Sequence, residues 1–311
     1  MRIKSSLGAL YRGIFRVCKN IKILSKGQSE NYAILQTAHR LEKGLCVSKP
    51  RKLWGFEKAE ILLTLILKEK QKNNSDLDAI NIGMGALAAY IMYKSLLNDQ
   101  EEKDKLSALK DKINKCGLSF PDGITNFGGV RHLSRLDFPS EGYDKLFLSR
   151  HSIRDFDDSP VSINIIIDAV ELALRAPSAC NRQANQVYVI SAEDRIKAGS
   201  QNDFNADKYL IVSGNIRAFS LNEQNDWIVS ASIFAGYLSL ALHAKGIGAC
   251  VIRKDIVEES TYCKNLRKML SIPEDEQIVI EIAIGNYKEW FDVPISHRIK
   301  AKDIIHLSPS L

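Results

Sequence analysis

Two guanidinium groups four residues apart form the first segment of this sequence with a clear chemical capacity. Arg150 and Arg154 enclose His151 and Ser152 in the run Ser-Arg-His-Ser-Ile-Arg. Arginine donates paired, planar hydrogen bonds to phosphate oxygens, and the imidazole and the hydroxyl add further donors. The segment therefore suits a phosphate dianion, although a solvated basic turn is the commoner explanation for an isolated pair of this spacing.

A second segment combines a helix stop, small side chains and amide donors. In chain order its members are Pro177, Ser178, Ala179, Cys180, Asn181 and Gln183. Small side chains let a flat ring approach the backbone, and the two amides can bond the polar edge of such a ring. Taken alone, the segment could equally be a polar loop between a helix and a strand.

A third segment lies near residue 298. Arg298 adds one more cation, and Ser296 and His297 before it add two more donors. In isolation it is an ordinary basic tail, so the meaning of all three segments depends on the elements that position them.

Helices and strands alternate in the second half of the chain. Helical patterns cover 162–175, with Ser162 as N-cap and Pro177 forcing the end, and 226–245 and 263–270. Strand patterns cover 187–191, 210–213, 246–252 with its opening turn, and 277–284, the last ended by Gly285. This alternation predicts a mixed α/β sandwich. Because 226–245 is almost wholly apolar, we expect it to be buried on most sides, and such helices often lie in dimer cores.

The first half is mainly helical, with candidate helices at 31–46, 56–72, 77–98 and 101–115. The glycine-containing stretch 116–129 is the best candidate for a boundary. We therefore predict an arm at residues 1–30, a helical region at 31–130 and a C-terminal domain at 143–311.

The arm carries the basic excess of the chain. The net charge is +6, yet seven of the 43 basic residues precede the first acid, Glu30, and the remaining 36 nearly balance 37 acids. Apolar residues recur in the arm at helical spacing: Leu7, Leu10, Tyr11, Ile14, Cys18, Ile21 and Leu24. A basic amphipathic helix can lie on an anionic membrane or on a partner, or can simply pack on its own domain. No aromatic-interleaved basic patch indicates nucleic acid.

Other classes of protein are disfavoured. No segment has the pattern expected of a membrane span, and the first residues make a poor secretory signal, so we expect a cytoplasmic protein, with peripheral contact at the inner face of the membrane as an option. The six cysteines are scattered without metal-ligand spacing, which indicates reduced thiols and no metal site.

The order and spacing of these motifs resemble the nitroreductase family over roughly residues 145–305. The motifs are RHSIR, APSACNRQ, GIGAC, IAIGNY and SHR. The resemblance implies an α+β fold, a nitroreductase-like mixed sheet flanked by helices, here with a mainly α-helical N-terminal region. It also implies a homodimer with FMN at the subunit interface, in which the helix beginning near Trp227 lies centrally.

Residue roles follow from the resemblance position by position. Arg150, His151, Ser152 and Arg154 match the segment that binds the FMN phosphate and ribityl chain, and Arg298 matches a C-terminal cation at the phosphate. The loop that matches the one against the isoalloxazine ring comprises Pro177, Ser178, Ala179, Cys180, Asn181 and Gln183. No side chain is assigned as catalytic, because the chemistry centres on the flavin.

The expected function is an FMN-dependent oxidoreductase that moves electrons from NAD(P)H to a small acceptor by a ping-pong mechanism. The alternative is a flavin-free, membrane-associated interaction protein with a degenerate fold. We interpret His243 as a hydrogen-bonded core histidine and Cys180 as noncatalytic. His39 and Glu42 either pair on a helix surface or belong to a stretch that covers the flavin, and we expect the helical first half to replace a substrate lid.

Overall fold

The structure is a computed structural model that describes residues 2–47, 51–131, 142–294, 296, 298 and 300–308. In residues 2–12 only the side chain of Leu10 is described. His297, part of the third predicted segment, lies outside the described residues.

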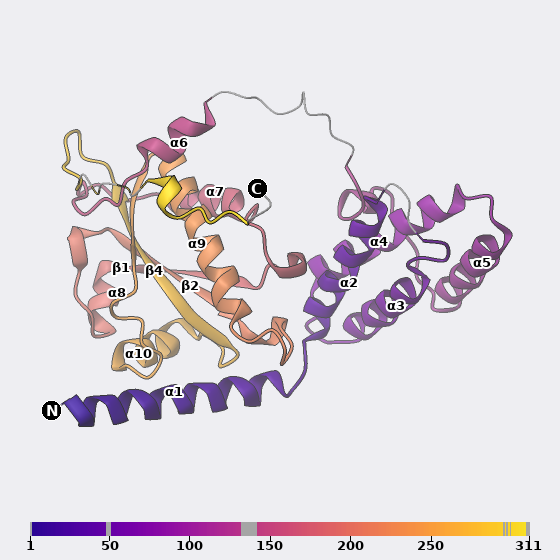
Figure 1. Cartoon of the computed structure of the whole chain (residues 1–311), viewed down its shortest axis with the longest axis horizontal. Helices are drawn as coiled ribbons and strands as arrows, with labels where there is room; N and C mark the ends of the chain where they lie inside the picture. Colours follow the sequence, from indigo (N-terminus) through magenta and orange to yellow (C-terminus); the bar gives the residue numbers. More distant parts are fainter. Residues whose placement is uncertain are drawn as a thin grey trace.

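Two lobes lie side by side, with a long helix along the lower edge of one of them (Figure 1). The helices are α1 Arg2–Leu24, α2 Glu30–Leu45, α3 Phe56–Lys70, α4 Leu77–Ser95, α5 Gln100–Lys115, α6 Tyr143–Ser149, α7 Ile163–Ala173, α8 Ala192–Lys197, α9 Asp226–Ala244 and α10 Thr261–Leu270. The strands are β1 Asn185–Ser191, β2 Lys208–Asn215, β3 Ile247–Ile252 and β4 Glu276–Asn286. Short 3-10 turns include η1 Ile124–Asn126, η3 Ala179–Asn181 and η5 Ile216–Ala218.

The four strands form one sheet in the order β1-β2-β4-β3, and all these pairings are antiparallel. A parallel bridge between Ser152 and Ala249 adds the mixed character that was predicted. Side chains alternate between the two faces of the sheet. Leu210 and Val212 pack with α7 and α9, whereas Tyr209 and Ile211 pack with α10 on the other face. The predicted α+β fold with flanking helices is therefore confirmed.

Helices α2 to α5 form the second lobe, whose core continues into the sheet lobe. Its buried side chains share one cluster with Ala184, Ile216, Ala218, Phe219 and Trp227 at one end of the sheet. The glycine stretch proposed as a boundary packs on α4. A Cβ at Gly85 would lie 2.5 Å from the backbone nitrogen of Gly128, so glycine permits this close approach.

Helix α1 packs along the sheet lobe rather than extending into solvent (Figure 1). Ile23 and Leu24 are buried, and Lys19 forms an ion pair of 3.3 Å with Glu258. After the helix, the Ser29 amide donates to the Arg217 carbonyl at 3.0 Å, and the Gln28 side chain donates to the Ala218 carbonyl at 2.8 Å. The arm is therefore docked on the domain through one of its faces.

Two sequence expectations need correction. Strand β4 does not end at Gly285 but continues to Asn286, because this glycine makes room for a ring and is not a turn. Helix α9 is buried on one side only: Val229, Ile233 and Tyr237 are exposed on the other.

By length and composition α9 would pass as a membrane span, against the sequence-based expectation. Half of its most apolar window is nevertheless buried inside the protein, as in the core helix of a soluble domain.

Candidate functional site

Three arginines from distant parts of the chain meet around one small cavity. It measures about 50 Å³ and is lined by Arg150, His151, Ser152, Arg154, Val293, Pro294, Ser296 and Arg298. The Arg154 guanidinium donates to the Ser152 carbonyl at 3.2 Å, and that of Arg298 donates to the Ser296 carbonyl at 2.9 Å. Among the residues that the structure describes, no carboxylate forms an ion pair with any of the three arginines. Such uncompensated positive charge favours a bound anion.

The arginine segment is held on the sheet by apolar side chains between the charges. Ile153 and Phe156 are buried, and the Ile153 amide donates to the Ala249 carbonyl at 3.0 Å. A Cβ at Gly285 would lie 2.5 Å from Phe156, and one at Gly248 would lie 3.1 Å from it. The two glycines thus let the Phe156 ring lie directly on β3 and β4. This packing directs Arg150 and Arg154 outward.

A hydrogen-bonded chain fixes the residue before Arg150. The Ser149 hydroxyl donates to the Lys145 carbonyl at 2.6 Å and lies 2.8 Å from Nε2 of His243, whose Nδ1 lies 2.8 Å from the Tyr287 hydroxyl. Since Ser149 has already donated its hydrogen, Nε2 of His243 must donate and Nδ1 must accept from Tyr287.

Burial, followed by the positive charges of Arg150 and His151, lowers the pKa of His243 below 6.5, so the ring is neutral at pH 7. The interpretation of His243 as a fully hydrogen-bonded histidine is confirmed, although the ring is only half-buried.

The predicted ring loop, residues 177–183, has an unusual backbone. Cys180, Asn181 and Gln183 all have positive φ, at 51°, 51° and 50°. Asparagine tolerates this left-handed region, but cysteine and glutamine rarely adopt it, and the strain is of the order of 1 kcal/mol or more for each. The Ser178 hydroxyl accepts from the Gln183 amide at 3.2 Å and closes the turn. Strain of this kind persists only where the surrounding structure enforces it.

Arg182, which was not predicted as a site residue, holds the strained loop in place. Its side chain is buried, donates to Glu223 at 2.5 Å and lies 5.0 Å over the Phe219 ring. With the Gln36 amide turned so that both of its ends are satisfied, the Gln36 oxygen on α2 also accepts from Arg182 at 2.5 Å. The loop is therefore tied to η5 and to the helical lobe.

The ring loop does not line the arginine cavity. No residue of 177–183 lines the cavity, and η3 packs on α2 at the junction of the two lobes. The structure thus brings together Arg150, His151, Ser152, Arg154 and Arg298, and it places the six predicted loop residues elsewhere.

The pair of His39 and Glu42 lies on α2 as predicted, with Nδ1 of His39 3.3 Å from Glu42. The other Glu42 oxygen accepts from the Gly129 amide at 3.1 Å, so this carboxylate also fixes the loop after η1. Cys180 is half-buried and forms no disulfide.

Three residues that position the site were not predicted from the sequence: Phe156, Tyr287 and Arg182. Phe156 stands two residues after Arg154, and Tyr287 ends the IAIGNY motif, but neither residue type indicates a role by itself. Arg182 could have been noticed as the one cation inside an otherwise small and neutral loop.

Comparison with known proteins shows what the C-terminal half of this chain resembles. The model described as "Nitroreductase family" matches residues 148–210. A protein of Archaeoglobus fulgidus, named provisionally as an NADH dehydrogenase/NAD(P)H nitroreductase, is 25% identical over 154 residues, covering 48% of this chain and 87% of that protein. These matches confirm the nitroreductase resemblance of the C-terminal half, and the coarse class that they support is an oxidoreductase.

Solved structures of similar fold span about half of the chain. A nitroreductase with bound FMN from Bacteroides fragilis NCTC 9343 has 15% identity and a TM-score of 0.46, covering 54% of this chain and 100% of its own. A nitroreductase with bound FMN from Desulfitobacterium hafniense DCB-2 has 18% identity and a TM-score of 0.42, covering 53% and 96%.

Proposed function

We propose that this protein is an FMN-dependent oxidoreductase that transfers electrons from NAD(P)H to a small acceptor by a ping-pong mechanism. The nitroreductase match supports the oxidoreductase class, and the names of relatives support the flavin and the nicotinamide donor. The identity of the acceptor is a separate question for assay.

One observation of the site carries the proposal. Three guanidinium groups, from residues 150, 154 and 298, surround a cavity without a carboxylate partner among the described residues. A phosphate monoester dianion would satisfy them with charge-assisted hydrogen bonds. The donors present therefore fit the phosphate end of FMN.

The protein's own groups bind and orient the cofactor. Arg150, Arg154 and Arg298 would bind the phosphate, with His151 and Ser152 donating along the ribityl chain. A bound flavin supplies the hydride-accepting and electron-donating chemistry. The neutral His243 fixes Ser149 and thereby Arg150, and no thiol or imidazole is needed as a nucleophile.

A homodimer is proposed to complete the flavin site. The loop of Ser178 does not line the arginine cavity and its 3-10 turn packs on α2, which supports a site shared between two subunits. Helix α9 exposes Val229, Ile233 and Tyr237 at helical spacing, a face of the apolar kind that homodimers bury. Pairing through this face would let the loop of one subunit approach the phosphate site of the other.

The helical lobe is proposed to cover the site in place of a substrate lid. It contacts the ring loop through α2 and Arg182, so removing it would release the strained backbone of the loop. Unchanged substrate kinetics after deletion of residues 1–130 would contradict this role.

The test of the cofactor site is the variant Arg298→Ala. Loss of a charge-assisted hydrogen bond costs roughly 1.5–3 kcal/mol, so we expect the Kd for FMN to rise about tenfold to a hundredfold. Titration of flavin fluorescence against apoprotein measures this change, and Arg51→Ala, which removes an exposed arginine of the helical lobe, is the matched control. If Arg298→Ala binds FMN as tightly as the wild type, the assignment of Arg298 is refuted. If the wild-type protein itself does not bind added FMN, the flavin-free alternative is supported.

A separate measurement tests the donor. We expect the absorbance of the bound flavin to bleach when NADH or NADPH is added without oxygen and to return when a quinone or nitroarene follows. If the flavin binds but is not bleached by NADH or NADPH, only the nicotinamide donor is contradicted, and the assignment of the FMN site stands.

A further inference from the structure

Helix α1 has two apolar faces, and the fold uses only one of them. The inner face carries Ile23, which is buried against the sheet lobe, and Leu24, the last residue of the helix, is buried as well. The outer face carries Leu10, Ile14, Val17 and Ile21, which keep 60%, 55%, 52% and 43% of their surface exposed. Their spacing of three and four residues places them in one stripe along the helix. We call these four residues the outer stripe.

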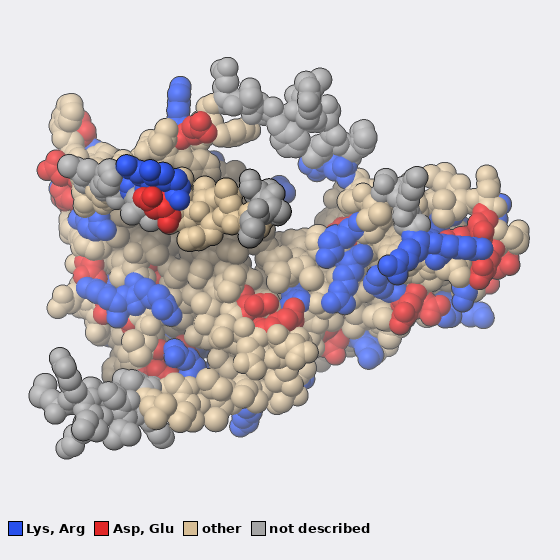
Figure 2. All heavy atoms as spheres, in the orientation of Figure 1, with Lys and Arg blue, Asp and Glu red and all other residues tan. Residues whose placement is uncertain are grey.

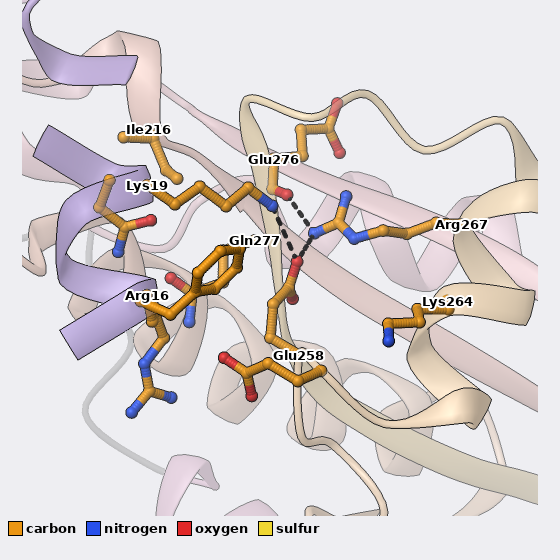
Figure 3. Close-up of a pocket in the computed structure, with 11 residues that line it drawn as sticks. Arg16, Lys19, Ile216, Glu258, Lys264, Arg267, Glu276 and Gln277 are labelled. Atoms are coloured by element: carbon orange, nitrogen blue, oxygen red, sulfur yellow. Dashed lines mark hydrogen bonds and ion pairs between the residues drawn. The ribbon is translucent and has the colours of Figure 1, made fainter. Parts of the chain in front are cut away.

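The inner face is fixed to the domain by an ion pair as well as by apolar contact. Lys19 reaches from α1 to Glu258, and Arg267 from α10 meets the same carboxylate (Figure 3). The Arg267 guanidinium also donates to the Glu276 carbonyl at 2.6 Å. These contacts hold α1 in a definite orientation, so the outer stripe points away from the domain.

Unpaired cations flank the outer stripe. Helical spacing places Lys22 beside the stripe, and Lys26 follows the helix, whereas Arg16 lies toward the domain and lines the cavity of Glu258 and Glu259. All three are exposed, and none forms an ion pair among the residues that the structure describes. The first acid of the chain is Glu30. The lower edge of the molecule, where α1 lies, is mostly uncharged, whereas acidic and basic side chains mix over the lobes (Figure 2).

We propose that α1 is an interfacial helix through which the protein binds an anionic lipid surface. The outer stripe enters the acyl boundary, and Lys22 and Lys26 bind the lipid phosphates. The helix is then held between the membrane and the sheet lobe. The basic charge and the apolar stripe thus act on one surface.

Charge and area favour lipid over a second copy of the chain. Two α1 helices packed stripe to stripe would bring their cations together without a compensating acid. Four half-exposed aliphatic side chains also offer only a few hundred Å², against roughly 800 Å² per partner in a stable interface. An anionic bilayer removes both difficulties, because it supplies the opposite charge and an unlimited apolar phase.

Flotation of the purified full-length protein with vesicles tests the proposal. We expect at least about tenfold stronger partition into phosphatidylcholine vesicles with about 30% phosphatidylglycerol than into phosphatidylcholine alone, weakening at high salt. The double variant Ile14→Glu/Val17→Glu should lose at least about tenfold of this binding. The variant Ile61→Glu/Met92→Glu adds the same two charges at exposed apolar positions of α3 and α4 and should bind like the wild type.

The controls separate lipid binding from misfolding and from self-association. Circular dichroism and thermal unfolding show whether each variant is folded. Substitutions in the outer stripe should leave the fold intact, because these side chains are exposed and do not belong to the core. Equal binding to both kinds of vesicle, no binding, or retained binding by Ile14→Glu/Val17→Glu would overturn the proposal. Sedimentation without lipid gives the molar mass of each protein in solution. A molar mass that falls in Ile14→Glu/Val17→Glu but not in Ile61→Glu/Met92→Glu would also overturn the proposal, because the outer stripe would then join two copies of the chain.

Discussion

Gly285 lies against Phe156, and we expect this contact to control both the stability of the domain and its affinity for flavin. In Gly285→Ala the new Cβ would lie 2.5 Å from Cβ and Cγ of Phe156. The ring cannot retreat, because it is fully buried and packs on Gly248 at its other edge. The backbone at residue 285 is not left-handed, so the substitution acts through this contact and not through φ.

The magnitude follows from overpacking. Inserting a methyl group into a filled core typically costs about 1–3 kcal/mol, against a gain of roughly 0.5–1 kcal/mol from replacing glycine within a strand. We expect a net loss of about 1–2 kcal/mol in the free energy of unfolding. Displacement of Phe156 also moves Arg154, two residues earlier, so the Kd for FMN should rise by up to about tenfold.

Two assays resolve these effects. Chemical denaturation of the apoprotein gives the stability, and flavin fluorescence titration gives the Kd. Gly13→Ala is the control for the glycine substitution itself, because a Cβ there meets nothing within 4 Å. Phe156→Leu in the Gly285→Ala background should recover part of the loss, since a smaller side chain admits the methyl group.

The outcome that refutes the reasoning is additivity. If the costs of Gly285→Ala and Phe156→Leu simply add, the two residues are not in energetic contact. A Gly285→Ala protein as stable as wild type would refute the packing argument directly.

Two further predictions concern buried charges. Burial raises the pKa of Glu223, but the hydrogen bonds from Arg182 and Ser220 and the charge of Arg182 together outweigh it, so the pKa lies below its usual value of 4.5. The Arg182–Glu223 pair therefore stabilises the fold above about pH 4.5 and loses its effect as the pH falls through the folded-state pKa. Glu223→Gln should therefore lower the free energy of unfolding at pH 7 by roughly 1 kcal/mol, measured by chemical denaturation. The difference in stability between the wild type and this variant should shrink in acid, and a difference that does not change with pH would contradict the pairing. Arg195 is fully buried and bonds both oxygens of Glu281 at 2.9 and 3.0 Å, so Arg195→Met should cost about 3–5 kcal/mol in chemical denaturation. The double variant Arg195→Met/Glu281→Leu should recover part of that cost. If the double variant is no more stable than Arg195→Met, the unpaired charge of Glu281 is not the cause of the destabilisation.

The sequence by itself predicted the elements whose patterns are local. Ser162 was predicted as the N-cap of a helix, and it is the residue that directly precedes α7. The alternation of β2 and the apolar run of α9 were also visible in the chain. Arg150 and Arg154 were predicted as anion ligands because guanidinium chemistry is a property of residue type, and the cavity that includes Arg298 agrees with that prediction.

Only the tertiary structure decided what distant contacts determine. Gly285 read as a strand end until Phe156, more than a hundred residues earlier, was seen to need its missing side chain. Arg182 was not predicted as a site residue, and only its burial against Phe219 and its bond to Glu223 show that it stabilises a strained turn. The arm could have faced its own domain or something outside it, and the fold shows that it packs on the domain through one face and exposes the other. Spacing along a chain reports which side chains share a face, but it does not report what that face meets, because the partner is brought there by chain folding.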